Sequence, residues 1–222
     1  MATRAVLAEL AAAWSAGSGV AVAIESVGGA DAVRRVQAGE VFDVVLLASD
    51  AIDNLAAAGH VQPGSRVDLV RSAVAIAVRA GAAQPDVSSE AAVRQAVLAA
   101  PSLSYSTGPS GSYLMQLFER WGIAEQIRPR LVQAPPGVPV GTLVARGEVA
   151  LGFQQLSEVM HLPGITVLGT LPPAIACITT FSGALPAAGK QGSQADAVRA
   201  MLAWMAGPEA ADAKCRHGME PA

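Results

Sequence analysis

Residues 20–47, VAVAIESVGGADAVRRVQAGEVFDVVLL, decide the fold. Two apolar runs, 20–24 and 42–47, each have the length of a buried strand, and the stretch 31–38 between them has helical spacing. A further helical stretch, from about 50 to 58, follows the second run. Continuous apolar strands that alternate with helices are typical of a parallel sheet covered on both faces. This part of the chain therefore predicts an α/β protein.

The same alternation continues on both sides of this stretch. The apolar segment 67–79 is long for one strand, and 174–181 is a second extended segment, so we expect both to cross between two lobes. The lobe boundaries that follow are 1–74 plus 177–222 for lobe 1 and 75–176 for lobe 2. The remaining predicted helices are 4–16, 90–99, one from 109, 140–145, 195–205 and 208–215, and the remaining strands are 103–106, 130–133, 149–153 and 165–168.

Composition excludes several classes of function. The chain is 52% hydrophobic with a formal net charge of −3, so it offers no clustered basic surface for nucleic acid. No apolar run has the roughly 20 residues that span a bilayer, and the N-terminus lacks the apolar core of a secretory signal. The three histidines and two cysteines have no metal-ligand spacing, so we expect no metal and no other cofactor. As written, the chain is expected to be cytoplasmic.

Loops after predicted strands carry small polar residues. In open parallel sheets, ligands bind beyond the carboxyl ends of strands, where helix starts present unpaired amides and a positive dipole end. Three such loops consist mainly of small and polar residues. Their candidate ligand residues are Ser26, Gly28 and Gly29 in the first loop, Ser49 in the second, and Ser106, Thr107, Gly108 and Ser110 in the third.

These residue types also cap helices and form turns, and for the first two loops that alternative stays open. The third loop has four hydroxyl groups within residues 106–112, more than one cap requires, and this density favours contact with a ligand. A fourth loop, 135–141, leads into a helix through Pro and Gly, and Gln155 follows the strand predicted at 149–153. The nucleotide motifs GxGxxG and GxxxxGK[ST] are absent, and GPSGS is not the GxSxG of serine hydrolases.

Three segments, taken in order, resemble the molybdate-binding branch of the type 2 periplasmic binding proteins. They are VGGADAVRRVQAGEVFDVVLLAS (27–49), YSTGPSG (105–111) and LVARGEVALGF (143–153). The resemblance implies two Rossmann-like lobes with mixed, mainly parallel sheets and a two-segment hinge. It implies an anion held in an interlobe cleft by hydroxyls and amides without a Lys or Arg. We also expect a monomer whose partner is an ABC-type permease.

Carried over residue by residue, the resemblance gives a ligand set from both lobes. It consists of Ser26, Gly28 and Gly29 from lobe 1 and Thr107, Gly108, Ser110 and Val138 from lobe 2. Gln155 stands where the family usually has a ligand-binding tyrosine. Because a carboxamide both donates and accepts hydrogen bonds, this departure suits a small organic carboxylate at least as well as molybdate.

The resemblance also leaves alternatives to solute binding. Aconitate-isomerase-type proteins are similar to this branch, so a cofactor-independent isomerase or tautomerase of a di- or tricarboxylic acid is one alternative. Glu25, Glu158 and His161 are then the candidates for proton transfer. An intracellular ligand sensor is another. Family members begin with a strand before the first helix, so we expect the natural protein to extend upstream of Met1 and, in that case, to be periplasmic.

Overall fold

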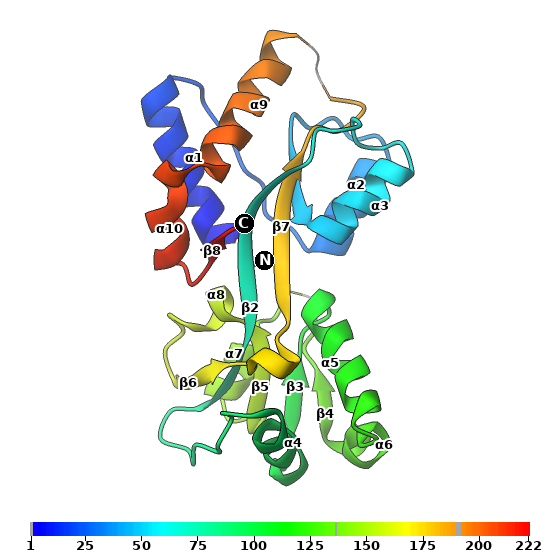
Figure 1. Cartoon of the computed structure of the whole chain (residues 1–222), viewed down its shortest axis with the longest axis vertical. Helices are drawn as coiled ribbons and strands as arrows, with labels where there is room; N and C mark the ends of the chain where they lie inside the picture. Colours follow the sequence, from blue (N-terminus) through cyan, green and yellow to red (C-terminus); the bar gives the residue numbers. More distant parts are fainter. Residues whose placement is uncertain (1, 136, 190–191) are drawn as a thin grey trace. The chain divides into compact units, whose positions relative to one another are not determined.

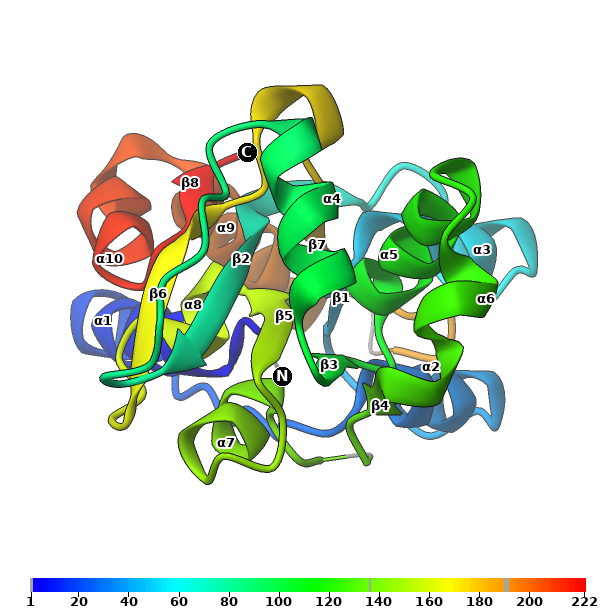
Figure 2. The same cartoon turned by 90° about the horizontal axis from the view of Figure 1, so that it is seen from below.

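The computed structural model describes residues 2–135, 137–189 and 192–222 (Figures 1 and 2). The chain divides into two compact units, with Met1–Ser72 and Thr179–Ala222 in unit 1 and Ala73–Ile178 in unit 2. The fold is α/β with mixed sheets, as the sequence predicts. The prediction that these sheets are mainly parallel is wrong, because most of the described strand pairs are antiparallel. Met1, to which the expected upstream extension would join, lies outside the described residues.

Unit 1 combines a small sheet with helices from both ends of the chain. Its helices are α1 (Arg4–Ser18), α2 (Gly29–Gln37), α3 (Ser49–Ala57), α9 (Ser193–Ala206) and α10 (Ala211–Arg216). Its strands are β1 (Val45–Ala48), the first half of β2 (Val67–Arg79), β7 (Ile178–Ala184) and β8 (Glu220–Pro221). Strand β1 pairs antiparallel with β7, and β8 pairs antiparallel with β2.

Alternation along β1 gives this sheet two apolar faces. Val45 and Leu47 pack in a cluster with residues of α2 and α3, whereas Leu46 packs against a cluster formed with α1, α9 and α10. Successive side chains of a strand point to opposite faces, so each apolar residue of β1 meets a different helical layer. Both faces of the sheet in unit 1 are therefore buried.

The prediction of a strand at 20–24 is wrong. Residues 19–28 have no regular secondary structure, and the Val20 side chain is 42% exposed. A strand needs a neighbour that pairs with its amides and carbonyls. Among the described strands, β1 pairs only with β7 and none pairs with residues 20–24. The strand predicted at 42–47 is also shorter than expected, since β1 covers only Val45–Ala48.

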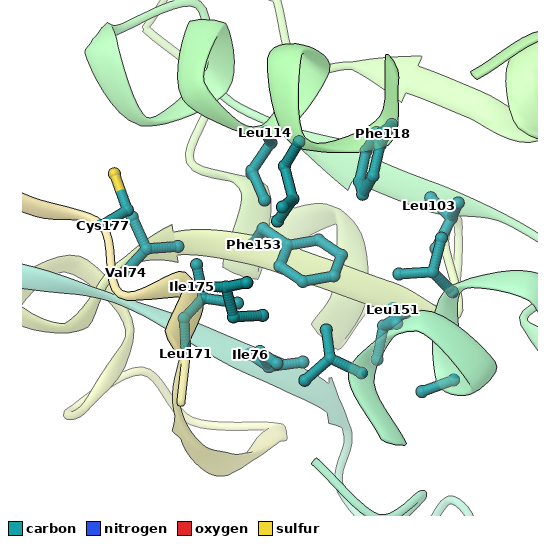
Figure 3. Packing of buried hydrophobic residues seen from close by; sticks show 14 of the residues in the cluster. Val74, Ile76, Leu103, Leu114, Phe118, Leu151, Phe153, Leu171, Ile175 and Cys177 are labelled. Atoms are coloured by element: carbon teal, nitrogen blue, oxygen red, sulfur yellow. The ribbon is translucent and has the colours of Figure 1, made fainter. Parts of the chain in front are cut away.

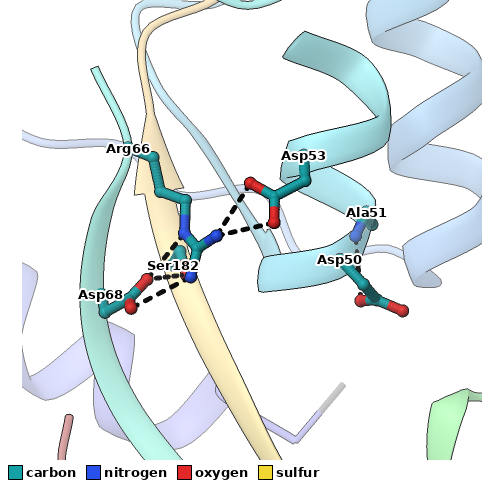
Figure 4. A network of polar contacts seen from close by, with 6 residues as sticks. All are labelled: Asp50, Ala51, Asp53, Arg66, Asp68 and Ser182. Atoms are coloured by element: carbon teal, nitrogen blue, oxygen red, sulfur yellow. Dashed lines mark hydrogen bonds and ion pairs between the residues drawn. The ribbon is translucent and has the colours of Figure 1, made fainter. Parts of the chain in front are cut away.

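A network of charged groups holds the beginning of β2 in unit 1 (Figure 4). The Arg66 guanidinium donates to both carboxylate oxygens of Asp68, from Nε at 2.8 Å and from Nη2 at 3.0 Å. Its Nη1 donates to Asp53 of α3 at 2.7 and 2.8 Å. The fully buried Ser182 of β7 donates its hydroxyl to Asp68 at 2.6 Å. Asp68 therefore joins Arg66 to β7.

We expect Asp68→Asn to destabilise the protein by about 1–2 kcal/mol, because charge-assisted hydrogen bonds exceed neutral ones in strength. The hydrogen bond from Arg66 holds the pKa of Asp68 below its usual value. A depressed folded pKa gives stability that is present above the unfolded pKa and is lost as pH falls through the folded pKa. Urea unfolding at pH 7 and pH 3 should thus show a smaller difference between wild type and variant at pH 3. An equal difference at both values would contradict the assignment.

Unit 2 contains the remaining elements. Its helices are α4 (Glu90–Ala99), α5 (Pro109–Arg120), α6 (Ala124–Ile127), α7 (Val140–Ala145) and α8 (Leu156–Val159). Its strands are the second half of β2, β3 (Leu103–Tyr105), β4 (Leu131–Gln133), β5 (Leu151–Gln155) and β6 (Ile165–Thr170). Strand β2 pairs antiparallel with both β5 and β6, whereas β3 pairs parallel with β4 and β5. The described parallel pairs thus belong to unit 2.

Helices cover both faces of the sheet in unit 2 (Figure 2). A Cβ atom on Gly152 would lie 2.5 Å from Val144 and 2.8 Å from Val140, so this face is closed by α7. The next residue, Phe153, points to the other face, where its ring lies 6.3 Å from that of Phe118 on α5 (Figure 3). The main core of unit 2 lies on this second face and includes residues of β2, α4, β3 and α5.

Candidate functional site

The carboxyl ends of three strands lie along one edge of the sheet in unit 2. Tyr105, the last residue of β3, is in register with Gln133 of β4 and with Phe153 of β5. The amide of Ala134 donates to the carbonyl of Tyr105 at 3.0 Å, which holds the segment after β4 against the end of β3. The loops that follow β3 and β5 therefore emerge at the same edge.

The loop after β3 turns directly into α5. The hydroxyls of Ser106 and Ser110 lie 3.0 Å apart and share a hydrogen bond. Ser110 is buried, Ser106 is half-buried and Thr107 is exposed. The structure thus brings together three of the hydroxyl residues that the sequence put forward.

The N-terminus of α5 has no side-chain cap. Gly108 is the N-cap residue, and Pro109 occupies the first position of the helix. The amides of Gly111 and Ser112 donate to the Gly108 carbonyl at 2.9 and 3.3 Å. Because the positive end of the helix dipole has no side-chain oxygen on it, this N-terminus can stabilise a negatively charged group.

Gly111 is a residue of this loop that the sequence analysis missed. A Cβ atom at this position would lie 1.9 Å from the carbonyl oxygen of Ser106 and 3.0 Å from the Tyr105 ring. Only a residue without a side chain allows the loop to lie so close to the first turn of α5. The signal in the sequence was a second glycine, inside the predicted start of a helix.

Two glutamines end β5 at the same edge. The strand was predicted at 149–153, but it covers Leu151–Gln155, so Gln154 and Gln155 are its last residues and both are buried. Since side chains alternate, Gln155 shares the α5 face with Phe153, and Gln154 shares the α7 face with Gly152. The Gly141 amide in the first turn of α7 donates to Oε1 of Gln154 at 3.0 Å.

The fourth predicted loop leads into α7. The amide of Val138 donates to the Pro135 carbonyl at 3.0 Å, so it closes a turn, and the Val138 side chain is half-buried. Pro136 lies outside the described residues. Val138 is therefore held next to the start of α7, which begins at Val140.

Glu158 lies in α8, which follows β5 without an intervening loop. Its side chain is half-buried, and burial raises the pKa of its carboxyl group, against the hydrogen bond from Gln154, which lowers it. The other two candidates for proton transfer differ. His161 is exposed, and Glu25 in unit 1 is exposed and bound through both oxygens to Arg35, at 2.7 and 2.9 Å. The bond to Arg35 lowers the pKa of Glu25.

Two arginines of unit 2, Arg130 and Arg146, lie on the amino side of the strands. Arg130 comes directly before β4 and donates to the carbonyls of Leu98 and Ala100, which precede β3. Arg146 precedes β5 and pairs with Glu148 at 3.7 Å. The donors described above at the carboxyl edge are neutral hydroxyls, amides and carboxamides.

The predicted residues of unit 1 lie at the starts of two helices beside β1. Gly28 is the N-cap of α2 and Gly29 is its first residue, and a Cβ on Gly29 would lie 3.9 Å from Leu47. Ser49 is the first residue of α3 and directly follows β1. Ser26 lies in the irregular segment before α2 and is exposed. Since the strand expected before it is absent, Ser26 does not follow a strand.

Other features of the described chain lie apart from these residues. A surface groove of about 480 Å³ in unit 2 is lined by residues 84–88 and 168–173, and none of the predicted ligand residues belongs to it. Within residues 2–135, 137–189 and 192–222, no three His, Cys, Asp or Glu side chains come together as metal ligands. The same residues contain no helix with the length and apolar character that crossing a bilayer requires.

This chain is similar to one family of proteins and to several known proteins. A family model described as bacterial extracellular solute-binding protein matches residues 1–220. A protein of Pseudomonas sp. named aconitate isomerase is 40% identical over 189 residues, which cover 85% of this chain and 71% of that protein. The periplasmic molybdate-binding protein of Azotobacter vinelandii has a similar fold, with a TM-score of 0.77 and 20% identity over 98% of this chain and 94% of that one. So does PEB3 with bound L-phospholactate, with a TM-score of 0.73 and 14% identity over 98% and 95%.

Proposed function

Because the chain belongs to the family of bacterial extracellular solute-binding proteins, we propose that its solute is a small organic acid with several carboxylate groups. Unit 2 binds one carboxylate at the carboxyl edge of its sheet, through Ser106, Ser110 and the first turn of α5. The observation that carries the proposal is this group of neutral donors at one helix start, with Arg130 and Arg146 on the amino side of the strands.

Neutral donors suit an anion that must also be released. A helix N-terminus and hydroxyl groups stabilise negative charge through partial charges and cost little reorganisation. Gln155 adds a carboxamide, which can accept a hydrogen bond from a hydroxyl or a protonated carboxyl as well as donate one. Among the ligands considered, the accepting oxygen suits a hydroxy acid such as citrate or tartrate, because molybdate and aconitate have no O–H group near neutral pH.

The relative from Pseudomonas supports the same choice of ligand. Aconitate is a tricarboxylate, and 40% identity over most of this chain is well above the 20% shared with the molybdate-binding protein. The likeness to the molybdate-binding protein concerns the fold, which holds many ligand classes. We therefore place tricarboxylates before molybdate among the ligands to be tested.

A thermal-shift screen tests the proposal. Citrate, cis-aconitate, trans-aconitate and tartrate are compared with molybdate and tungstate at the same ionic strength. A ligand present at 100 times its Kd stabilises the folded protein by about 2.7 kcal/mol, so a tricarboxylate should raise the Tm by several degrees. A shift with molybdate or tungstate alone would replace the proposed ligand class, and no shift with any anion would contradict the proposal.

Two variants locate the site in that screen. We expect Ser110→Ala and Gln155→Ala each to weaken binding of the carboxylate about 10-fold or more, because each loses a hydrogen bond to a charged group. Gln116→Ala is the matched control, since Gln116 lies on the exposed side of the same helix α5. Isothermal titration calorimetry measures the three affinities. Unchanged affinity in both test variants would move the ligand elsewhere.

Isomerisation of the bound acid is a second candidate function. It is favoured by the similarity to aconitate isomerase and by a half-buried carboxyl group, Glu158, at the same edge of the sheet. Incubation with cis-aconitate, followed by proton NMR, distinguishes it from binding alone. Formation of trans-aconitate would establish turnover, and an unchanged spectrum with bound cis-aconitate would leave solute binding as the function.

A further inference from the structure

Three titratable residues were put forward by the sequence for proton transfer, and their surroundings separate them. Glu25 has both oxygens on Arg35, and the side chain is exposed, so it is a solvated ion pair. His161 is exposed in the turn after α8. Glu158 alone among these three is half-buried and lies in α8, which begins at the same edge of the sheet as the loop that holds Ser106.

Gln154 fixes the orientation of Glu158. The buried Gly141 amide donates to Oε1 of Gln154 at 3.0 Å, so the carbonyl end of this carboxamide faces α7. The Gln154 side chain is also hydrogen-bonded to Glu158. Since Oε1 is the acceptor for Gly141, the Nε2 group is the donor to the Glu158 carboxylate. The start of α7 thus positions Gln154, and Gln154 positions the carboxylate.

The surroundings of Glu158 also set its strength as a base. Burial disfavours the charged carboxylate and raises the pKa of Glu158. A carboxylate with a raised pKa binds a proton more readily than a solvated one and can return it at the next step. The neighbouring hydroxyls of Ser106 and Ser110 do not supply such a group, because they stay protonated near neutral pH.

We propose that Glu158 is the catalytic residue that moves a proton between two carbons of a bound unsaturated tricarboxylate such as aconitate. This inference rests on the proposed function of unit 2 as a carboxylate-binding site. Strands β3 and β5 are paired neighbours, about 4.8 Å apart, so the loop that holds Ser106 and the helix that holds Glu158 start from the same edge. One bound molecule with several carboxylates can reach both.

The reaction needs no further reactant. The Glu158 carboxylate takes a proton from the methylene group, whose C–H bond lies between a carboxylate and a carbon–carbon double bond. The electron pair of that C–H bond forms a new double bond to the central carbon, and the electrons of the old double bond move to the far carbon. The far carbon then receives the proton from the Glu158 carboxyl, which returns to the carboxylate. Substrate and product have the same atoms and the same charge.

Glu158→Gln tests the assignment in the full chain. The substitution keeps the size of the side chain and removes the base. We expect the affinity for cis-aconitate, measured by titration calorimetry, to stay within about 3-fold of wild type. We expect conversion to trans-aconitate, and deuterium uptake from D2O into the methylene group, to fall about 100-fold or more, as for loss of a general base.

Glu148→Gln is the matched control. Glu148 is an exposed glutamate of the same unit, on the amino side of β5, where it pairs with Arg146 at 3.7 Å. It should leave both binding and conversion at the wild-type level. Glu158→Asp serves as a second variant, because it keeps the carboxyl group and shortens its reach. We expect it to fold like wild type and to slow conversion about 10-fold or more with binding retained.

Each outcome decides a different point. Binding of cis-aconitate without conversion by the wild type overturns the role of Glu158 and leaves the binding site standing. Conversion by Glu158→Gln at the wild-type rate also overturns the role of Glu158. If Glu158→Gln does not fold, conversion by Glu158→Asp at the wild-type rate overturns that role instead. Absence of binding by the wild type overturns the proposed function, and the role of Glu158 with it. Lost conversion with retained binding supports both.

Discussion

Gly111→Ala should destabilise the protein by about 3 kcal/mol and remove its affinity for a carboxylate ligand, because the new methyl group meets the backbone. The Cβ atom would lie 1.9 Å from the Ser106 carbonyl oxygen, and a peptide group cannot turn away as a flexible side chain can. The loop 106–108 must therefore move off the first turn of α5. This movement separates Ser106 from Ser110, whose hydroxyls are 3.0 Å apart in the native loop.

The measurements are urea unfolding for stability and titration calorimetry for the ligand identified in the thermal-shift screen. Gly17→Ala is the control, since Gly17 lies in α1 and a methyl group there would meet no neighbouring atom within 4 Å. There the same substitution should be neutral or should stabilise by about 0.5 kcal/mol through helix propensity. A Gly111→Ala protein with wild-type stability and affinity would show that the loop does not need this close approach.

Lys214→Met should stabilise the protein by about 2 kcal/mol, which corresponds to a rise in Tm of roughly 4–8 °C for a chain of this size. The Lys214 side chain is fully buried in unit 1, and among the described residues its amine has no hydrogen-bond partner. Burying an unpaired amine costs free energy that methionine, with a similar length and no charge, does not cost.

The effect should also depend on pH. Burial lowers the pKa of Lys214 below the unfolded value of about 10.4. As pH falls below that unfolded value, the unfolded chain takes up the proton first, and folding of the wild type becomes less favourable. The advantage of Lys214→Met is therefore largest near neutral pH and shrinks as pH rises toward 10.4. Differential scanning calorimetry between pH 7 and pH 10 measures this trend.

Arg94→Met provides the comparison for Lys214→Met. Arg94 is an exposed residue of α4, and loss of its charge should change stability by no more than about 0.5 kcal/mol at any of these pH values. If Lys214→Met is instead less stable than wild type at pH 7, the amine stabilises the fold and the assignment of an unpaired buried group is wrong.

The local pattern of apolar and polar residues was enough to predict most of the helices and strands. The segments predicted as a strand at 67–79 and as helices at 90–99 and 140–145 have these bounds in the structure, as β2, α4 and α7. Each has a strong local signal, either an apolar run between polar residues or helical spacing between caps. The segment 20–24 had an equally apolar run but is irregular, because strands exist only in pairs.

The candidate site could likewise be predicted from the sequence only in part. Ser106, Thr107, Gly108 and Ser110 could be selected from sequence because four hydroxyls in seven residues are visible along the chain. The requirement for glycine at 111, the link from Gly141 through Gln154 to Glu158, and the choice of Glu158 over Glu25 could not. These depend on which backbone atoms and charges approach from other elements.

The sequence alone therefore determined the family, the α/β class, the approximate positions of most helices and strands, and the hydroxyl-rich loop before α5. The tertiary structure decided which apolar run becomes a strand, that Glu158 is half-buried whereas Glu25 and His161 are exposed, and that the Lys214 amine is buried without a described hydrogen-bond partner. Apolar periodicity and helix caps are properties of neighbouring residues. Hydrogen-bond pairing of strands, burial of charges and close backbone contacts arise between residues far apart in the chain, and only the folded arrangement specifies them.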